Sequence, residues 1–151
     1  MYEPTIYEVL KKDKISSKTF LGVFARNEIP KIINYPACFI MNTENRNKPG
    51  EHWLAIHYNE KGQCFFFDSF GNQPKHHNLQ NYIEKTSKSW TYNKRRVQGF
   101  SEYCGFYCLL FLLFKTRNQP QQFFKKFTLD YIKNDKIIEN EIKIRTKSLL
   151  N

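Results

Sequence analysis

The sequence predicts an α+β fold in which a small mixed or antiparallel sheet packs against a buried central helix and is flanked by further helices. Two observations carry this prediction. The segment EHWLAIHYNEKGQCFFFDSFG, residues 51–71, contains two alternating or aromatic-rich runs separated by NEKG, which indicates a β-hairpin. The segment CGFYCLLFLLF, residues 104–114, is apolar on nearly every side, as in a helix that is buried all round.

Two further elements are predicted before the hairpin. In PTIYEVLKKD, residues 4–13, a proline suits the first helical turn, and Ile6, Val9 and Leu10 follow at helical spacing. These features predict a short amphipathic helix. The apolar segment YPACFIMNT, residues 35–43, is typical of a buried strand.

Four elements are predicted after the hairpin. Residues 78–88, NLQNYIEKTSK, favour a helix, and residues 89–97, SWTYNKRRV, alternate like a strand. Two amphipathic helices are expected over residues 120–134 and 135–150. The chain contains no repeat, low-complexity tract or long linker, so we expect a single domain over residues 1–151.

Composition limits the class of protein. The chain has 151 residues, of which 40% are hydrophobic, enough for one compact core. No CxxC pair and no secretory leader are present, which predicts free thiols in a reducing compartment. The longest apolar run is shorter than the roughly 18 residues that a membrane span needs, so we expect a soluble protein without membrane contact.

The formal net charge is +10, from 24 Lys and Arg against 14 acidic residues. Such an excess attracts polyanions through phosphate contacts that weaken with salt. Two interpretations stay open, a surface that binds DNA nonspecifically or an ordinary solvated lysine surface, because no nucleic-acid-binding signature is present. The basic residues gather in four groups: Lys11, Lys12 and Lys14; Lys94, Arg95 and Arg96; Lys125 and Lys126; Lys143, Arg145 and Lys147.

The hairpin brings a histidine and an acid together. If it is antiparallel and turns about Glu60, residues whose numbers sum to 120 lie opposite one another, which places His52 opposite Asp68. Opposed residues share a face of the sheet, with Cβ atoms about 5 Å apart. An imidazole–carboxylate contact is therefore expected, provided that the loop has an odd length or contains a bulge.

A third group completes a possible reaction centre. Cys104 begins the apolar helix, and helix N-termini and nearby imidazolium ions favour the thiolate, which is the nucleophilic form of cysteine. A carboxylate behind the imidazole fixes its tautomer and orientation. Gln98, six residues before Cys104, could direct an amide N–H at a developing oxyanion beside the backbone N–H of Cys104.

Each residue also has a purely structural interpretation. Cys108 lies inside the apolar run and fits a core position, and Cys104 alone is as consistent with a core residue as with a nucleophile. His57 lies an odd number of residues from His52, so it faces the other side of its strand. A metal site formed by Cys104, Cys108 and the loop pair His76 and His77 matches no standard zinc spacing, so we predict no metal.

The order of these motifs along the chain is more specific than any one of the residues alone. EHWLAIHY, then FFFDSFG, then VQGFSEYCGFYCLLFL resembles the adenovirus maturation protease (adenain) family and, more distantly, the SUMO-specific proteases that share its fold. TFLGVFARNEIP followed by YPACFIMNT is similar to the amino-terminal region of adenain. The resemblance covers Thr19 to Leu113, and the histidine–tryptophan pair, acid, glutamine and cysteine occur in the order that the family has.

The resemblance implies catalytic roles. His52 would be the general base, Asp68 its orienting acid, Gln98 the oxyanion donor and Cys104 the nucleophile, with Trp53 packed beside the histidine. The reaction would be peptide-bond hydrolysis through a thioester acyl-enzyme. The expected substrates are viral capsid or core precursor proteins, cleaved after or beside glycine by a monomer in the virion and the host cell.

The chain departs from the family in three respects. Adenoviruses commonly have glutamate as the orienting acid, whereas Asp68 is closer to the SUMO proteases. Adenain is activated by DNA and by a peptide that is disulfide-linked to a cysteine before the Gln motif, but residues 85–96, KTSKSWTYNKRR, contain no cysteine. The chain is also shorter at its carboxyl end. We therefore expect no cofactor for the chemistry, and activation, if any, by DNA or a noncovalent peptide.

Two other function classes remain. A protease that removes ubiquitin-like modifiers such as SUMO would use the same four residues, and cleavage of a fusion at its Gly-Gly terminus would reveal it. A noncatalytic basic DNA-binding protein would explain the charge but would leave the order of His, Asp, Gln and Cys as coincidence.

Overall fold

The structure, a computed structural model, describes residues 3–44, 52–75 and 78–150. Its strands are β1 Phe20–Phe24, β2 Ala37–Asn42, β3 Trp53–Tyr58, β4 Gln63–Phe67 and β5 Ser89–Tyr92. Its helices are α1 Glu3–Lys12, α2 Leu79–Thr86, α3 Cys104–Lys115, α4 Pro120–Phe124 and α5 Tyr131–Leu150, with short 3-10 turns at Ser16–Lys18 and Arg26–Glu28.

The five strands form one mixed sheet in the order β1-β2-β3-β4-β5. The outer pairs β1–β2 and β4–β5 are parallel, and the inner pairs are antiparallel. The predicted fold class is confirmed. β1 has no counterpart among the predicted elements, and its register to β2 shifts between Phe20 and Val23, around Gly22 with a φ of 141°.

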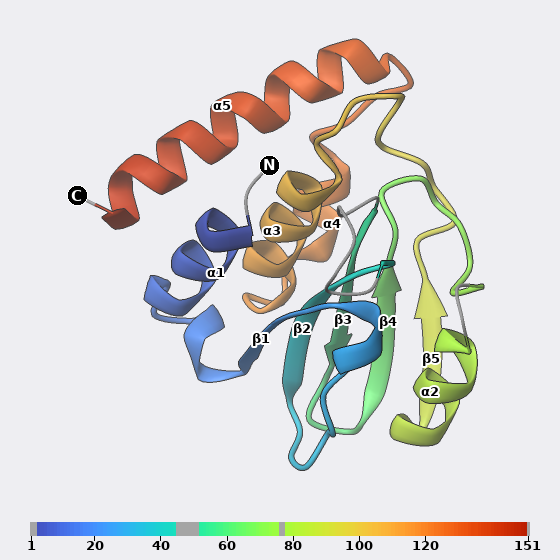
Figure 1. Ribbon diagram of the computed structural model, residues 1–151. Coiled ribbons are helices and arrows are strands. Elements are labelled where there is room, and N and C mark those ends of the chain that lie inside the picture. Colours follow the sequence, from blue (N-terminus) through green and yellow to red (C-terminus); the bar gives the residue numbers. More distant parts are fainter. Residues whose placement is uncertain (1–2, 45–51, 76–77, 151) are drawn as a thin grey trace.

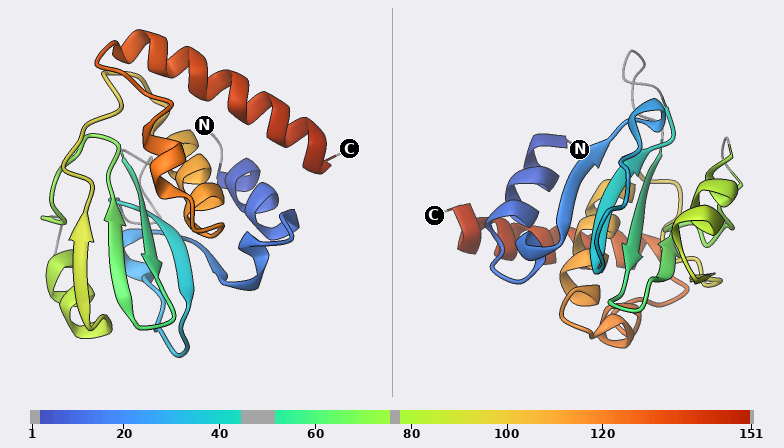
Figure 2. Two further views of the ribbon diagram at one scale, coloured as in Figure 1. Left: turned by 180° about the vertical axis from the view of Figure 1, so that it is seen from behind. Right: turned by 90° about the horizontal axis from the view of Figure 1, so that it is seen from below.

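Helices cover both faces of the sheet, so the molecule has three layers (Figures 1 and 2). α1, α3, α4 and α5 lie on one side and α2 on the other. Each face has its own apolar cluster: Ala55 and Phe67 face α3, whereas Leu54 and Phe66 face α2. This alternation follows from the period of two along a strand.

The central helix α3 is buried as predicted. Its side chains from Tyr107 to Phe114 are all buried, because α1, α4 and α5 pack around it on the side away from the sheet. Phe111 stacks on Phe67 of β4 with 4.5 Å between ring centroids, and Phe123 of α4 meets the Phe111 ring edge to face. Such aromatic packing stabilises the helix through its large buried apolar area.

The predicted hairpin is present, but its predicted register was wrong by two. Observed partners have numbers that sum to 122, as in Ile56 opposite Phe66 and Tyr58 opposite Cys64. The cause lies in the turn, where Gly62 has a φ of 77° and its N–H donates to the Asn59 carbonyl. A left-handed glycine closes a three-residue loop of residues 60–62 and moves the turn centre from residue 60 to residue 61. The odd loop length keeps His52 and Asp68 on one face, as expected.

The predicted boundary between the two last helices was also wrong. We expected a break between residues 134 and 135, whereas the helices are separated by residues 125–130 and α5 begins at Tyr131. Polar side chains hold this corner. Asp130 accepts a hydrogen bond from the Lys133 N–H, and the buried Asn134 amide bonds both the N–H and the carbonyl of Thr128. These bonds satisfy backbone groups that a helix end leaves free.

Candidate active site

His52 and Asp68 are in direct contact. Nε2 of His52 lies 2.7 Å from Oδ1 of Asp68, so the predicted imidazole–carboxylate contact is confirmed. If the β3–β4 register continued, Phe70 would stand opposite His52, and its ring does stack on the imidazole at 4.6 Å between centroids. Asp68 is therefore a diagonal rather than a direct neighbour, which a carboxylate can still reach.

The end of β5 holds Asp68 in place. The Asn93 side chain accepts a hydrogen bond from the Asp68 N–H at 3.0 Å and donates to the Asp68 carbonyl at 2.6 Å. Oδ1 of Asp68 also accepts from the Phe70 N–H at 2.8 Å, which closes a tight turn directly after β4. The carboxylate is completely buried, and its orientation towards His52 is fixed by both segments.

The surroundings of His52 favour its charged form. Burial lowers its pKa, but hydrogen bonding to Asp68 and to Cys104, together with the charges of both groups, outweighs burial and raises the pKa to about 9. An imidazolium is thus the expected form at neutral pH. A cation is also favoured against the face of the stacked Phe70 ring.

Cys104 is the first residue of α3 and remains 6% exposed. Its thiol is near enough to His52 to contribute to the raised imidazole pKa. Nδ1 of His52, the nitrogen not used by Asp68, is buried and makes no hydrogen bond of normal geometry to any described residue. Among described residues, no side chain caps the start of α3, so its first N–H groups are available to stabilise negative charge.

The other three cysteines are unsuited to nucleophilic attack. Burial raises the pKa of Cys38 and of Cys64 to about 12, and it raises the pKa of Cys108 well above the usual value of a thiol. The Cys108 thiol instead donates to the Trp53 carbonyl at 3.3 Å. These residues are core thiols, which agrees with the structural interpretation of Cys108.

Gln98 is completely buried just before α3, and its side chain is held at both ends. Its Oε1 accepts a hydrogen bond from the Ser69 hydroxyl. Its Nε2 donates to the Ser101 carbonyl at 2.8 Å and to the Ser101 hydroxyl at 3.1 Å. The amide nitrogen of Gln98 is thus directed at Ser101 in this structure.

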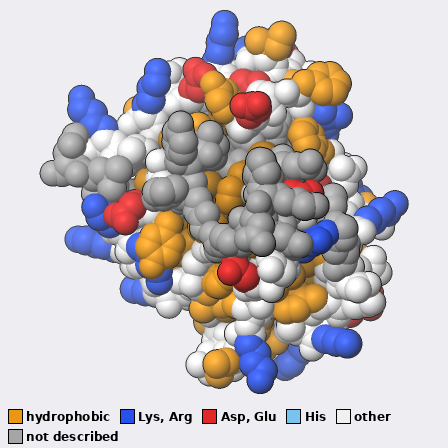
Figure 3. Space-filling model, viewed as in Figure 1, with side chains coloured by type: hydrophobic (Ala, Val, Ile, Leu, Met, Phe, Trp, Pro, Cys, Tyr) orange, Lys and Arg blue, Asp and Glu red, His pale blue; other side chains and the backbone are white. Residues whose placement is uncertain are grey.

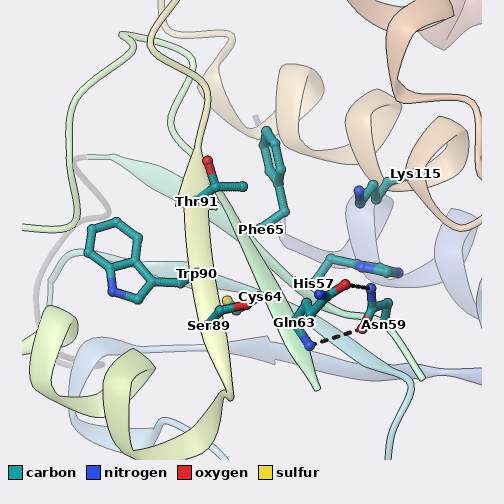
Figure 4. Close-up of a pocket in the computed structure, with 9 residues that line it drawn as sticks. All are labelled: His57, Asn59, Gln63, Cys64, Phe65, Ser89, Trp90, Thr91 and Lys115. Carbon is teal, nitrogen blue, oxygen red and sulfur yellow. Dashed lines mark hydrogen bonds between the residues drawn. The ribbon is translucent and has the colours of Figure 1, made fainter. Parts of the chain in front are cut away.

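A second Cys–His combination lies at the opposite end of α3, in a pocket of about 290 Å³ (Figure 4). It is lined by His57 and Cys64 and by Lys115, the last residue of α3. Burial and the charge of Lys115 lower the pKa of His57 to about 4. His57 and Lys115 lie on one side of β4 in Figure 4, whereas Cys64 packs in the cluster on the α2 side. This pair therefore lacks the arrangement of a nucleophile and base.

Several basic residues have structural partners. Arg95 donates to the Phe124 and Phe127 carbonyls, and Arg96 to the Gln98 and Gly99 carbonyls. On the face seen in Figure 3, Lys and Arg side chains are scattered around the rim rather than joined in one patch. Binding of DNA stays a prediction.

The described residues offer neither a cluster of metal ligands nor a membrane-spanning helix. The described residues contain no group of three or more His, Cys, Asp or Glu side chains that could hold a metal ion, and His76 and His77 lie outside them. No helix in residues 3–44, 52–75 and 78–150 is long and apolar enough to cross a membrane.

Four residues that support the site were not among those predicted from the sequence. Phe70 and Asn93 had a usable signal, because each closely follows a predicted strand that ends at the site. Ser101 and Asp135 had none. Their hydroxyl–carboxylate contact of 3.0 Å joins residues that are 34 positions apart, and it depends on how α5 crosses the loop before α3.

Relatives of this chain are viral proteases. The adenovirus endoprotease family model matches residues 20–147. The protease of human adenovirus A serotype 12 is 31% identical over 111 residues, which are 62% of this chain and 53% of that protein. The protease of bovine adenovirus C serotype 10 is 30% identical over 130 residues, 75% of this chain and 65% of that protein. The chain thus spans between half and two thirds of the length of these relatives.

Solved structures with low sequence identity share the fold. The ASFV pS273R protease superimposes with a TM-score of 0.61 at 18% identity, covering 97% of this chain and 66% of that one. ChlaDub1 from Chlamydia trachomatis gives 0.57 at 13% identity, covering 99% and 78%. These likenesses concern the fold alone, whereas the family model spans the hairpin, Gln98 and Cys104. The chain belongs to the adenovirus endoprotease family.

Proposed function

We propose that this chain is a cysteine endopeptidase with Cys104 as nucleophile, His52 as base and acid, Asp68 as the group that orients His52, and Gln98 as oxyanion donor. The observation that carries the proposal is the 2.7 Å contact from Asp68 to Nε2 of His52, which leaves Nδ1 for the thiol at the start of α3. Family membership supports the same assignment.

The proposed reaction has two halves. The Cys104 thiolate attacks the peptide carbonyl carbon, and the resulting oxyanion is stabilised by the Cys104 N–H and the Gln98 amide. The His52 imidazolium gives its proton to the leaving amine, and a thioester remains. Neutral His52 then takes a proton from water, the hydroxide attacks the thioester, and collapse of the second oxyanion releases the acid and the thiolate.

The proposed substrates are precursors of viral capsid or core proteins, cut after or beside glycine. Support comes from the relatives, which are proteases of adenoviruses. A bond beside glycine suits a nucleophile that is only 6% exposed, because a residue without a side chain can approach it closely. The site would act in the virion and in the host cell as a monomer, with viral DNA or a noncovalent peptide as the candidate activator.

The test is incubation of the wild-type chain with candidate viral structural proteins and, in parallel, with SUMO and ubiquitin fusions. We expect cleavage of the structural proteins and none by Cys104→Ala. Cleavage of the fusions alone would replace the proposed substrate with a ubiquitin-like modifier and retain the chemistry. Equal cleavage by wild type and Cys104→Ala would refute the proposed function.

A further inference from the structure

We propose that Asp135 of α5 is a positioning residue that orients the Gln98 amide through the Ser101 hydroxyl. The inference rests on the proposed function and adds to it a group from the far end of the chain. It concerns the three hydrogen-bonded side chains Gln98, Ser101 and Asp135.

Each hydrogen bond among Gln98, Ser101 and Asp135 has a defined direction. The Ser101 hydroxyl donates to Oδ1 of Asp135 at 3.0 Å, and an ionised carboxylate only accepts. Because a hydroxyl has one hydrogen, the lone pairs of the Ser101 oxygen are left for donors. Nε2 of Gln98 is one such donor, at 3.1 Å. Asp135 thereby makes Ser101 an acceptor, and Ser101 in turn requires the N–H side of the Gln98 amide to face it.

The oxygen end of the Gln98 amide contacts Ser69. Oε1 of Gln98 is bonded by Ser69, whose hydroxyl can donate to an oxygen or accept from an NH₂ group. Ser69 therefore tolerates either orientation of the amide. The Ser101 side specifies it, through an acceptor-only backbone carbonyl at 2.8 Å and the hydroxyl that Asp135 controls.

The orientation of the Gln98 amide matters for catalysis. An oxyanion beside Cys104 requires N–H groups, and a flipped amide would present its carbonyl oxygen and repel the charge. An oxyanion would accept one of the two Nε2 hydrogens, and the other would stay bonded to Ser101. Asp135 thus keeps the donor in position before substrate arrives, which is the preorganisation that such sites require.

The start of α5 is anchored so that Asp135 stays against this loop. The buried Asn134 donates to the Val97 carbonyl at 2.9 Å. The Tyr107 hydroxyl of α3 donates to the same Asp135 oxygen at 2.7 Å. Gly99 packs so closely on Tyr131 that an added Cβ would lie 2.9 Å from the Tyr131 Cβ. The segment from residue 97 to residue 101 is therefore held by the first two turns of α5.

The experiment compares variants by kcat and KM on the substrate found for the wild type. Asp135→Leu should lower kcat about tenfold with little change in KM, because it removes the acceptor of the Ser101 proton. Asp135→Asn should restore nearly all activity, since one amide oxygen can accept from both Ser101 and Tyr107. Ser101→Ala should lose as much as Asp135→Leu, and the double variant no more than either alone.

Glu141 provides the matched control on the same helix. It pairs with Lys126 and Arg145, away from the loop, so Glu141→Leu should leave kcat unchanged. Alkylation of Cys104 by iodoacetamide should proceed at the wild-type rate in every variant, because the nucleophile itself is unaltered. If Asp135→Leu does not fold, Ser101→Ala with its pair Ser101→Thr gives the same comparison.

The outcomes separate the inference from the proposed function. Absence of hydrolysis by the wild type refutes the proposed function and the inference with it. Hydrolysis that Asp135→Leu and Ser101→Ala leave unchanged refutes the inference alone. Loss in Asp135→Asn equal to that in Asp135→Leu, or additive losses in the double variant, also overturns the relay through Ser101.

Discussion

A cysteine and a histidine lie near each end of α3, but the pKa values of the two histidines are shifted in opposite directions. At its first residue, Cys104 lies near His52, whose pKa is raised to about 9. At its last residue, Lys115 lies near His57, whose pKa is lowered to about 4, and the neighbouring Cys64 has a pKa raised to about 12. Both histidines lie at or beside β3, five residues apart, and both are largely buried.

The difference lies in the partners rather than in burial. Burial opposes the imidazolium in both cases. Beside His52 the Asp68 carboxylate and the Cys104 thiol overcome it, whereas beside His57 a lysine adds to it. The helix reinforces this contrast, because its N-terminus stabilises an anion and its C-terminus a cation. Only the His52 end can support an ion pair of thiolate and imidazolium.

Of the changes considered, removal of the Asp68 carboxylate should have the largest effect on the difference between the two ends of α3. Asp68→Asn should lower peptidase activity about a thousandfold, because the imidazole loses its orienting and charge-stabilising partner. The pKa of His52 should fall from about 9 towards that of an isolated buried histidine, as measured by NMR titration of the ring protons. His57→Gln is the control and should retain activity. An Asp68→Asn protein with normal activity and an unshifted His52 pKa would refute the assigned role.

The next effect concerns stability below neutral pH. Since the His57 pKa is lowered on folding, the unfolded chain binds a proton between about pH 6.5 and pH 4 that the folded chain does not. The free energy of unfolding should therefore decrease as the pH falls through this interval, by up to about 3 kcal/mol from this residue. Urea unfolding at several pH values measures it. His57→Phe should lose this component of the pH dependence, and identical pH profiles for the two proteins would contradict it.

For His52, the free energy of unfolding should depend on pH in the opposite direction. Its raised pKa adds stability that is complete below about pH 6.5 and is lost as the pH rises to about 9. The same unfolding series, continued to alkaline pH, should show this decrease in the wild type. His52→Phe should not show it.

The smallest effect should come from Lys115. Lys115→Met removes a charge that lowers the His57 pKa, so this pKa should rise. It should stay below 6.5 because burial, the larger cause, remains. The His52 pKa and peptidase activity should not change. Ring-proton titration of both histidines in one sample measures the comparison directly, and a shift of His52 alone would contradict it.

Part of the fold and of the site could be predicted from the sequence. The strand period and an odd loop placed His52 and Asp68 on one face, although Gly62 moved the register by two. The apolar run predicted a buried α3 with Cys104 at its start. Local patterns could not predict the corner at residues 125–130, which depends on side-chain bonds from Asn134, nor the contact of Ser101 with Asp135. Both depend on tertiary packing of segments that are polar by composition.

Mass-spectrometric mapping of iodoacetamide labelling tests the central claim most directly, because it needs no substrate. In the folded protein at neutral pH, label should appear on Cys104 and be absent from Cys38, Cys64 and Cys108. His52→Ala should slow the labelling of Cys104 by tenfold or more, roughly the effect of losing a paired imidazolium. Labelling of Cys64 as fast as Cys104, or a Cys104 rate unchanged in His52→Ala, would contradict the account.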